Sequence, residues 1–158
     1  MNDSLYHNRH MTLIDHKKAY FDYEILEKIE AGIVLKGFEV KSLKLKRGSL
    51  EGAYVLVRAG QAEVCNMLIP PYQEKNAPAD YDPRHPRKLI ISKNEIIRLS
   101  STSSDRKGLT IVPISVYLKG DLIKLGIAVV RGKKKYDKRE TTKKRETERE
   151  MNRIMKDR

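Results

Sequence analysis

Five acidic residues follow one another between positions 22 and 39, and hydrolytic enzymes often pair carboxylates. The five are Asp22, Glu24, Glu27, Glu30 and Glu39. A hydrolase would need two of them paired at a cleft, or several held around a metal ion. Residue alternation places Asp22 and Glu24 on one outward face of a strand, which favours solvated side chains. Glu30 and Glu39 lie near a glycine or an aromatic residue, and on a basic surface they would accept hydrogen bonds from base amino groups.

The sequence contains none of the common catalytic motifs: no P-loop, no GxGxxG, no nucleophile elbow and no HExxH. The histidines lack acidic or cysteine partners at metal-ligand spacing; they are His7, His10, His16 and His85. Cys65 is the only cysteine, so no internal disulfide is possible, and the surrounding AEVCNMLI predicts a buried strand position. We therefore expect no enzyme, no metal and no cofactor.

The positive charge is concentrated at the end of the chain. The 158 residues include 33 Lys and Arg and 21 Asp and Glu, a formal net charge of +12. From Arg131 onward there are 13 basic and 6 acidic residues, which leaves a net charge of only about +5 on residues 1–130. Such asymmetry predicts a polyanionic partner, either nucleic acid or an anionic membrane. The N-terminus has no signal peptide and no apolar run spans a membrane, so we expect a soluble, cytoplasmic protein.

Among nucleic acids, a folded RNA fits the composition best. Lysine and arginine bind phosphates without regard to sequence. Eight tyrosines, two phenylalanines and no tryptophan give weak support for a base-stacking platform. No segment is typical of a helix that reads double-stranded DNA. Recognition of RNA by shape, through a basic protein face, is the better match.

The elements that must position these residues are mostly strands. Residues 20–35 alternate as one long strand or two linked strands, with a kink at Ala31-Gly32. Two hairpins are predicted, one over 54–69 with a turn at 59–61, and one over 109–132 with a turn at 119–121. A short helix is predicted over 38–47. A second is predicted after Ser92, which has Glu95 at capping-box spacing and Ile96, Ile97 and Leu99 toward the core. Residues 70–88 hold five of the six prolines and predict a long loop.

These elements predict a mainly β fold: an OB-like antiparallel barrel of about six strands with two or three short helices. We expect a flexible N-terminal arm at 1–15, an RNA-binding barrel at 16–130 and a basic tail at 131–158. The tail offers one apolar cluster, made of Met151, Ile154 and Met155 on one helix face. Its charge pairs both support and oppose a helix, so we expect it to be disordered when free and helical when bound.

Several blocks of the sequence resemble the SmpB family of SsrA-binding proteins from bacteria. They are EAGIVLKGFEVKSLKLKRGSLEGAYVLV, DPRHPRKLIIS, GLTIVPISVYLKG and GIAVVRGKKKYDKRETTKKRE. The resemblance covers roughly residues 14–158 in matching order, and it departs from the family at His16, where asparagine is usual. It implies a non-enzymatic protein, expected to be a monomer, that binds the tRNA-like domain of transfer-messenger RNA (tmRNA). The protein would deliver that RNA to stalled ribosomes for trans-translation.

The resemblance also implies two groups of functional residues. The RNA-binding group is Lys17, Lys18, Glu30, Ala31, Gly32, Glu39, Lys41, Ser42, Arg87 and Lys88. The tail group would meet ribosomal RNA near the decoding centre and fold in the empty messenger channel; it is Gly132, Lys133, Lys134, Asp137, Lys138, Arg139, Ile154 and Met155. In the first group the cations would hold phosphates, Glu30 and Ser42 would meet bases or 2′-hydroxyls, and Gly32 would permit a close backbone approach.

Two alternatives remain open from the sequence. A ribosomal or ribosome-assembly protein of barrel type would share the basic surface and would purify with empty ribosomal subunits. An RNA-processing hydrolase would use Asp22, Glu30 or Glu39, and would cut RNA in the presence of magnesium.

Overall fold

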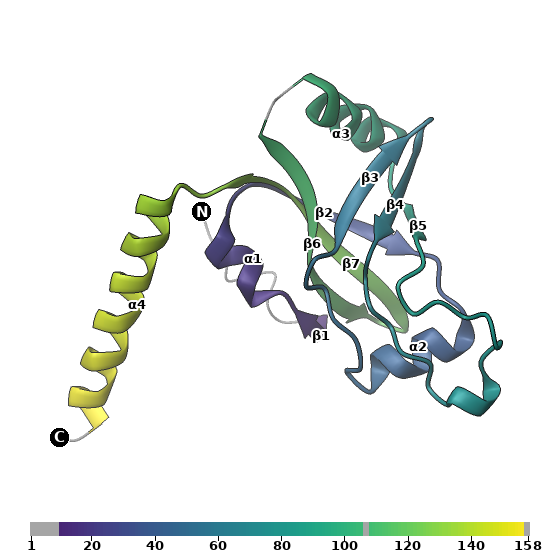
Figure 1. Cartoon of the computed structure of the whole chain (residues 1–158), viewed down its shortest axis with the longest axis horizontal. Coiled ribbons are helices and arrows are strands. Elements are labelled where there is room, and N and C mark those ends of the chain that lie inside the picture. Colours follow the sequence, from purple (N-terminus) through teal and green to yellow (C-terminus); the bar gives the residue numbers. More distant parts are fainter. Residues whose placement is uncertain (1–9, 106–107, 157–158) are drawn as a thin grey trace.

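A computed structural model describes residues 10–105 and 108–156 and shows one antiparallel sheet of seven strands (Figure 1). The strands are β1 (His10–Asp15), β2 (Tyr23–Ile33), β3 (Tyr54–Arg58), β4 (Gln61–Cys65), β5 (Arg87–Ile90), β6 (Leu109–Lys119) and β7 (Leu122–Gly132). Their order across the sheet is β1-β6-β7-β2-β5-β4-β3. The sheet curls so that β3, at one end of this order, contacts β6 near the other end. The result is a partly open barrel, which confirms the predicted mainly β, antiparallel fold class.

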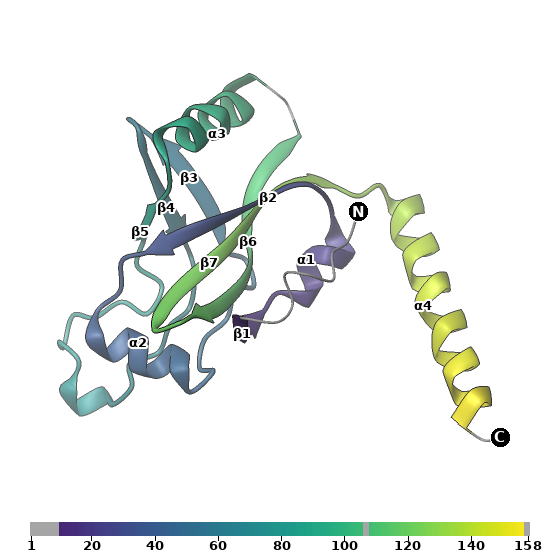
Figure 2. The same cartoon turned by 180° about the vertical axis from the view of Figure 1, so that it is seen from behind.

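Helices cover the barrel at its ends and on one outer face (Figures 1 and 2). The α-helices are α1 (Lys17–Asp22), α2 (Gly37–Lys44), α3 (Lys93–Asp105) and α4 (Lys135–Lys156), and a 3-10 turn spans Glu74–Asn76. In both views α2 and α3 lie at opposite ends of the barrel, while α4 extends away from it. Among the described helices, none combines the length and the apolar character needed to cross a membrane.

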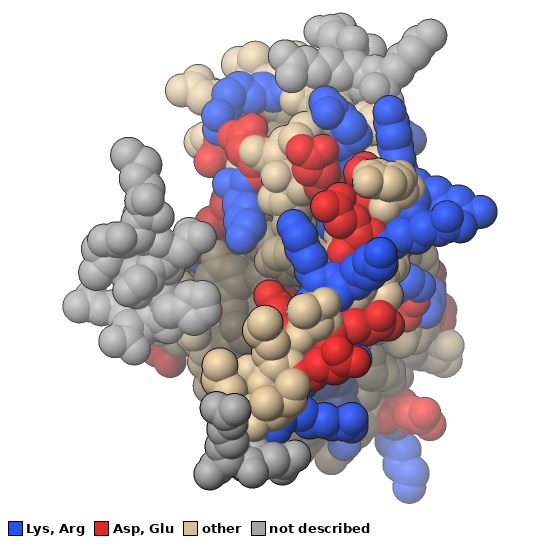
Figure 3. Space-filling model, turned by 90° about the vertical axis from the view of Figure 1, so that its left-hand side faces the viewer, with Lys and Arg blue, Asp and Glu red and all other residues tan. Residues whose placement is uncertain are grey.

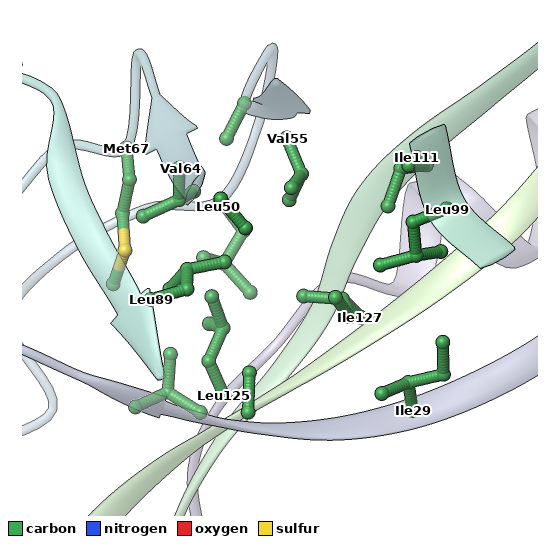
Figure 4. Close-up of a cluster of buried hydrophobic side chains, with 14 of the residues drawn as sticks. Ile29, Leu50, Val55, Val64, Met67, Leu89, Leu99, Ile111, Leu125 and Ile127 are labelled. Atoms are coloured by element: carbon green, nitrogen blue, oxygen red, sulfur yellow. The ribbon is translucent and has the colours of Figure 1, made fainter. Parts of the chain in front are cut away.

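The barrel interior is filled by apolar side chains from all seven strands. Figure 4 shows many of these side chains. Ile29, Leu125 and Ile127 come from the central strands, and Val64 and Leu89 come from the opposite wall. A second, smaller cluster lies on the outer face of β6 and β7, where Ala19 of α1 packs on Val112, Ile114, Ala128 and Val130. This second cluster explains why α1 lies flat against the sheet.

Both predicted hairpins are confirmed, with turns at Ala59-Gly60 and Gly120-Asp121. The positive φ angles of Gly60 (72°) and Gly120 (62°) are the reason for glycine at these turns. The capping box before α3 is also confirmed, because Glu95 accepts hydrogen bonds from the Ser92 backbone N–H (3.1 Å) and hydroxyl (3.0 Å). Within α3, Leu99 is buried as predicted, whereas Ile97 points into solvent.

The structure corrects the predicted N-terminal arm. Residues 10–15 form β1, which pairs with β6 and buries Leu13 in the barrel core. Pairing gives β6 a partner on the side away from β7, where an 11-residue strand would otherwise leave its backbone groups unpaired. The rest of the predicted arm, residues 1–9, lies outside the described residues.

Three further elements differ from the sequence-based predictions. Residues 17–22 form α1, where alternation predicted the start of a strand, because Ala19 packs inward onto the outer face of β6 and β7. The irregularity in β2 lies between Ile25 and Glu27, where the register of β2 against β7 shifts by one residue, and not at the predicted Ala31-Gly32, where the pairing is regular. Arg87–Ile90 form β5 at the end of the predicted loop, because their backbone joins β2 and β4.

The predicted disordered tail is a helix of 22 residues in this structure. No glycine or proline follows Gly132, and most residues in the segment are strong helix formers. Contacts with α1 add to this propensity: Lys138 Nζ lies 3.3 Å from Asp22 Oδ1, and Lys133 Nζ donates to the Tyr20 carbonyl (3.1 Å). None of the helix residues is buried, so its stability rests on local bonds and on these few contacts.

Candidate nucleic-acid interface

The outer face of β2 and β6 carries an ionised carboxylate held by two donors. Glu30 accepts hydrogen bonds from the Tyr117 hydroxyl and from Lys119 Nζ (2.9 Å). Glu30 pairs with Gly126 on the intervening strand β7, and a Cβ at Gly126 would lie 2.7 Å from Ser115 Oγ. Glycine at position 126 therefore leaves room for the Ser115 side chain, which lies opposite it on β6.

These contacts fix the protonation of both groups. The hydrogen bond from Tyr117 is the main reason that the pKa of Glu30 lies below its usual range. Burial, the next largest effect, raises the pKa, and Lys119 and Lys124 lower it again. Burial, followed by the hydrogen bond to Glu30, raises the pKa of Tyr117. At neutral pH the group is a carboxylate facing a neutral phenol and two lysines, a surface that presents both hydrogen-bond donors and an acceptor.

Beside Glu30, strands β2 and β5 approach each other closely. A Cβ at Gly32 would lie 3.2 Å from Ile90 Cβ, and Lys124 of β7 pairs with Gly32 on its other side. Ile90 is 63% exposed, and Lys88 is also exposed. Ala31, in contrast, faces the barrel core and is fully buried. Gly32 and Lys88 thus extend the Glu30 surface, and Ala31 supports it from inside.

Helix α1 lies on the same side of the sheet as Glu30. Lys28 follows the same outward alternation on β2 as Glu30, and its Nζ lies 5.6 Å from the centroid of the Tyr20 ring on α1. Lys17 and Lys18 of α1 are exposed, and Lys18 Nζ donates to Glu51 Oε1 (2.8 Å). At the start of the helix, His16 Nδ1 lies 2.9 Å from the Pro113 carbonyl oxygen. The cations of α1 and the Glu30 group therefore share one outer face.

Glu39, in contrast, lies inside the protein, in a buried ion pair with Arg87. Arg87 Nε donates to Glu39 Oε1 at 2.8 Å, and the same oxygen accepts from the Tyr81 hydroxyl (3.0 Å) and lies 2.7 Å from His85 Nε2. The other carboxylate oxygen caps α2 by accepting from the Lys36 backbone N–H (2.8 Å). The Arg87 guanidinium also donates to the carbonyls of Met67, Pro83 and His85. This network joins α2, β5 and the proline-rich loop.

The network also decides the charge states of its members. Burial alone would raise the pKa of Glu39, but the bonds from Lys36, His85 and Arg87 outweigh it and hold the pKa below its usual range. Burial and the hydrogen bond to Glu39 raise the pKa of Tyr81 to about 12. Glu39 is therefore a fully bonded carboxylate, and Tyr81 is a neutral donor.

The structure divides the predicted RNA-binding residues into two sets. Lys17, Lys18, Glu30, Lys41 and Lys88 are exposed, and Gly32 is partly so. Ala31, Glu39, Ser42 and Arg87 are buried, and in this structure their side chains do not reach the surface. Lys41 lies on α2, where its Nζ is 5.7 Å from the centroid of the Tyr72 ring. Only the exposed set can contact a ligand directly, whereas the buried set supports the surface from inside.

The predicted tail residues span the junction of β7 and α4 and the far end of α4. Gly132 ends β7, and the Lys133 backbone N–H donates to the Asp22 carbonyl (3.0 Å), which turns the chain toward α1. Lys134, Asp137 and Arg139 are exposed, whereas Lys138 is half-buried beside Asp22. Ile154 and Met155 are 62% and 75% exposed. Figure 3 shows the side of the molecule that carries α4, with basic and acidic side chains interspersed over it.

Sequence reasoning missed several members of these surfaces. Tyr117, Lys119 and Lys124 come from the second hairpin, and only the register of β6, β7 and β2 brings them to Glu30. Their outward alternation along each strand was the available signal, but it did not say which strand lies beside which. Tyr81 and His85 were predicted only as part of a long loop. Their structural role was missed because their partner, Glu39, is more than 40 residues away in the sequence.

The carboxylates considered for hydrolysis do not meet. Asp22 pairs with Lys138, Glu30 binds Tyr117 and Lys119, and Glu39 is enclosed with Arg87. Each carboxylate already has its own cation or donor, in a separate part of the fold. Over residues 10–105 and 108–156, no three His, Cys, Asp or Glu side chains are grouped to hold a metal ion.

Comparison with known proteins agrees with the resemblance in the sequence. The family model described as SmpB protein matches residues 13–157. An SsrA-binding protein of Carboxydothermus hydrogenoformans is 43% identical over 143 residues, which covers 90% of this chain and 95% of the relative. An SsrA-binding protein of Staphylococcus carnosus is 45% identical over 147 residues, 93% of each chain.

A solved structure is similar as well. It is named "tmRNA-SmpB: a journey to the center of the bacterial ribosome" and superposes with a TM-score of 0.65 at 39% identity. The match covers 77% of this chain and 85% of that chain. With the family model spanning residues 13–157 and relatives above 40% identity over more than 90% of their length, this chain belongs to the SmpB family.

Proposed function

We propose that this protein binds the tRNA-like domain of tmRNA and accompanies it to stalled bacterial ribosomes for trans-translation. The role is that of an RNA-binding adaptor without catalytic activity, working in the cytoplasm. Membership of a family whose relatives are named SsrA-binding proteins supports it, as does similarity to a structure named for tmRNA and SmpB on the ribosome.

The observation that carries the proposal is the polar surface around Glu30. It combines an ionised acceptor, the neutral donor Tyr117 and the lysines Lys119 and Lys124 on paired strands of the sheet. Lys17 and Lys18 lie on the same outer face, and Gly32 and Lys88 extend the surface toward β5. Such a surface suits a folded RNA, because phosphates bind the lysines while Glu30 accepts from a base or a 2′-hydroxyl.

The tail has a separate part in the proposal. Helix α4 projects from the barrel with Met151, Ile154 and Met155 exposed near its end. On the ribosome we expect this helix to enter the empty messenger channel, where its cations meet ribosomal RNA and its apolar residues find a partner. The body would then hold tmRNA while α4 reports that no message is present.

The test is binding of the tRNA-like domain of tmRNA to a Glu30→Ala variant, by fluorescence anisotropy. Losing a hydrogen bond to a charged group costs roughly 1.5–3 kcal/mol, so we expect about 10- to 100-fold weaker binding. Glu24→Ala is the matched control, because Glu24 is exposed on the same strand and should leave affinity unchanged or slightly higher. Equal affinity of wild type and Glu30→Ala would contradict the proposed surface.

A further inference from the structure

A basic groove of about 400 Å³ lies between α1 and α4. Lys17 and Tyr20 of α1 form one side, and the other side is formed by Arg145, Glu148, Arg149 and Asn152 of α4. The α4 residues are spaced three and four apart, so they form one stripe along the helix that faces α1. The groove therefore joins the barrel and the tail.

The groove has an excess of positive charge that the protein itself does not neutralise. Lys17, Arg145 and Arg149 face a single carboxylate, Glu148. Within the described part of the chain, none of these three cations forms an ion pair, and Arg145 lies 5.7 Å from the centroid of the Phe21 ring. Tyr20, 36% exposed, adds an aromatic surface to the lining. Unpaired guanidinium groups beside an aromatic ring suit an anionic ligand with planar groups.

A separate set of contacts fixes the width of the groove at one end. Lys138 Nζ lies 3.3 Å from Asp22 Oδ1, the Lys133 ammonium donates to the Tyr20 carbonyl (3.1 Å), and the Lys133 backbone N–H donates to the Asp22 carbonyl (3.0 Å). These bonds satisfy carbonyl groups at the C-terminal end of α1. They hold the first turn of α4 against α1, so that Arg145 and Arg149 remain opposite Lys17.

We propose that this groove binds the backbone of single-stranded RNA, so that the barrel and the tail hold the same strand. Arg145, Arg149 and Lys17 contact successive phosphates, and Tyr20 stacks on a base. Asp22 is a positioning residue that acts through Lys138 and does not touch the RNA. The inference rests on the proposed role in RNA binding, and the groove shares only Lys17 with the surface proposed around Glu30.

The first test compares two variants of equal net charge. Arg145→Gln with Arg149→Gln removes the α4 side of the groove, whereas Lys143→Gln with Arg153→Gln removes two cations that do not line it. The probe is a fluorescein-labelled dodecamer of uridine. We expect the groove variant to bind at least about 10-fold more weakly, with the salt slope reduced by about 1.4, and the control to stay within about threefold of wild type. Equal losses for the two variants would overturn the proposal, because overall charge would then explain both.

The second test uses the sign of the effect. Asp22→Asn removes a negative charge, so electrostatics alone predicts tighter RNA binding. If Asp22 positions α4 through Lys138, the groove opens and the dodecamer binds about threefold or more weakly instead. Asp121→Asn, in the β6–β7 turn, removes the same charge away from the groove and should bind as wild type or slightly tighter. An Asp22→Asn variant that binds as tightly as wild type, or tighter, would refute the positioning role.

Two further measurements separate this inference from the proposed function and from another ligand class. The tRNA-like domain of tmRNA should bind the groove variant with nearly wild-type affinity, because its proposed site is the Glu30 surface. Binding of that domain without any binding of the dodecamer would defeat only the groove, whereas failure of the wild type to bind the domain would defeat the proposed function. Oligoglutamate of matched charge should not displace the dodecamer; equal displacement would assign the groove to acidic peptides.

Discussion

At the scale of single residues, the Glu39 network shows how an ion pair, Glu39 with Arg87, is buried inside the protein. Glu39 and Arg87 are 0% and 2% exposed, and every polar atom of the guanidinium has a partner. Desolvating two charges is costly, and only such complete hydrogen bonding makes a buried pair tolerable. The network ties the proline-rich loop to α2, so it places Lys41 on α2 and Lys88 on β5 relative to each other.

Glu39→Gln is expected to destabilise the protein by roughly 3 kcal/mol at pH 7, because it leaves the buried Arg87 charge without its counter-ion. The pKa of Glu39 is depressed in the folded state, so its stabilising effect is fully present above the unfolded value of about 4.3 and is lost as the pH falls through the folded value. Urea unfolding of both proteins between pH 7 and pH 3 should show the difference in free energy shrinking toward acid. A constant difference would show that the ionised carboxylate is not the source of the stability.

At the scale of elements, β1 shows that the N-terminal segment is part of the barrel. Leu13 is buried, whereas Met11, two residues earlier, is 55% exposed. Leu13→Ala should cost about 2–4 kcal/mol, the range for deleting a buried leucine side chain. Met11→Ala, the matched control, should change stability by less than about 0.5 kcal/mol. Chemical denaturation measures the free energy of unfolding of both variants. If Leu13→Ala were as stable as Met11→Ala, residues 10–15 would not be packed in the barrel, and the predicted flexible arm would be correct.

Helix α4 carries an apolar cluster, Met151, Ile154 and Met155, in which each residue is more than half exposed. Replacing Ile154 and Met155 by glutamine keeps helix propensity high and removes only the apolar surface. We expect an unchanged melting temperature and reduced peptide tagging on stalled ribosomes. A drop in melting temperature that matched the loss of tagging would mean that the pair packs against the body.

The success of sequence prediction differed between elements for physical reasons. Glycine turns and alternating strands specify the two hairpins locally, so both were predicted. β1 and α1 are six residues each, too short for a periodic pattern, and are fixed by packing on β6 and β7. β5 follows five prolines and becomes a strand only through β2 and β4. The family resemblance gave the candidate residues, but not that Glu39, Ser42 and Arg87 are buried. Burial depends on packing between distant segments; the Arg87 contacts with Met67 and Glu39, for example, join residues 20 and 48 positions apart.

At the scale of the whole molecule, the barrel and α4 have different sources of stability. The barrel encloses a continuous core, whereas α4 buries no residue and contacts the barrel mainly through α1. Removal of α4 should therefore leave the barrel folded. This separation underlies the expectation that the body binds tmRNA and that the helix acts on the ribosome.

The most direct measurement of this central claim uses a chain truncated after Lys134, which keeps all of β7 and removes α4. Affinity for the tRNA-like domain of tmRNA and peptide tagging on ribosomes stalled without a message are measured on the same preparation. We predict affinity within about threefold of the full-length protein and tagging reduced to background. Loss of RNA affinity in parallel with tagging, or full tagging without α4, would contradict the division between barrel and tail.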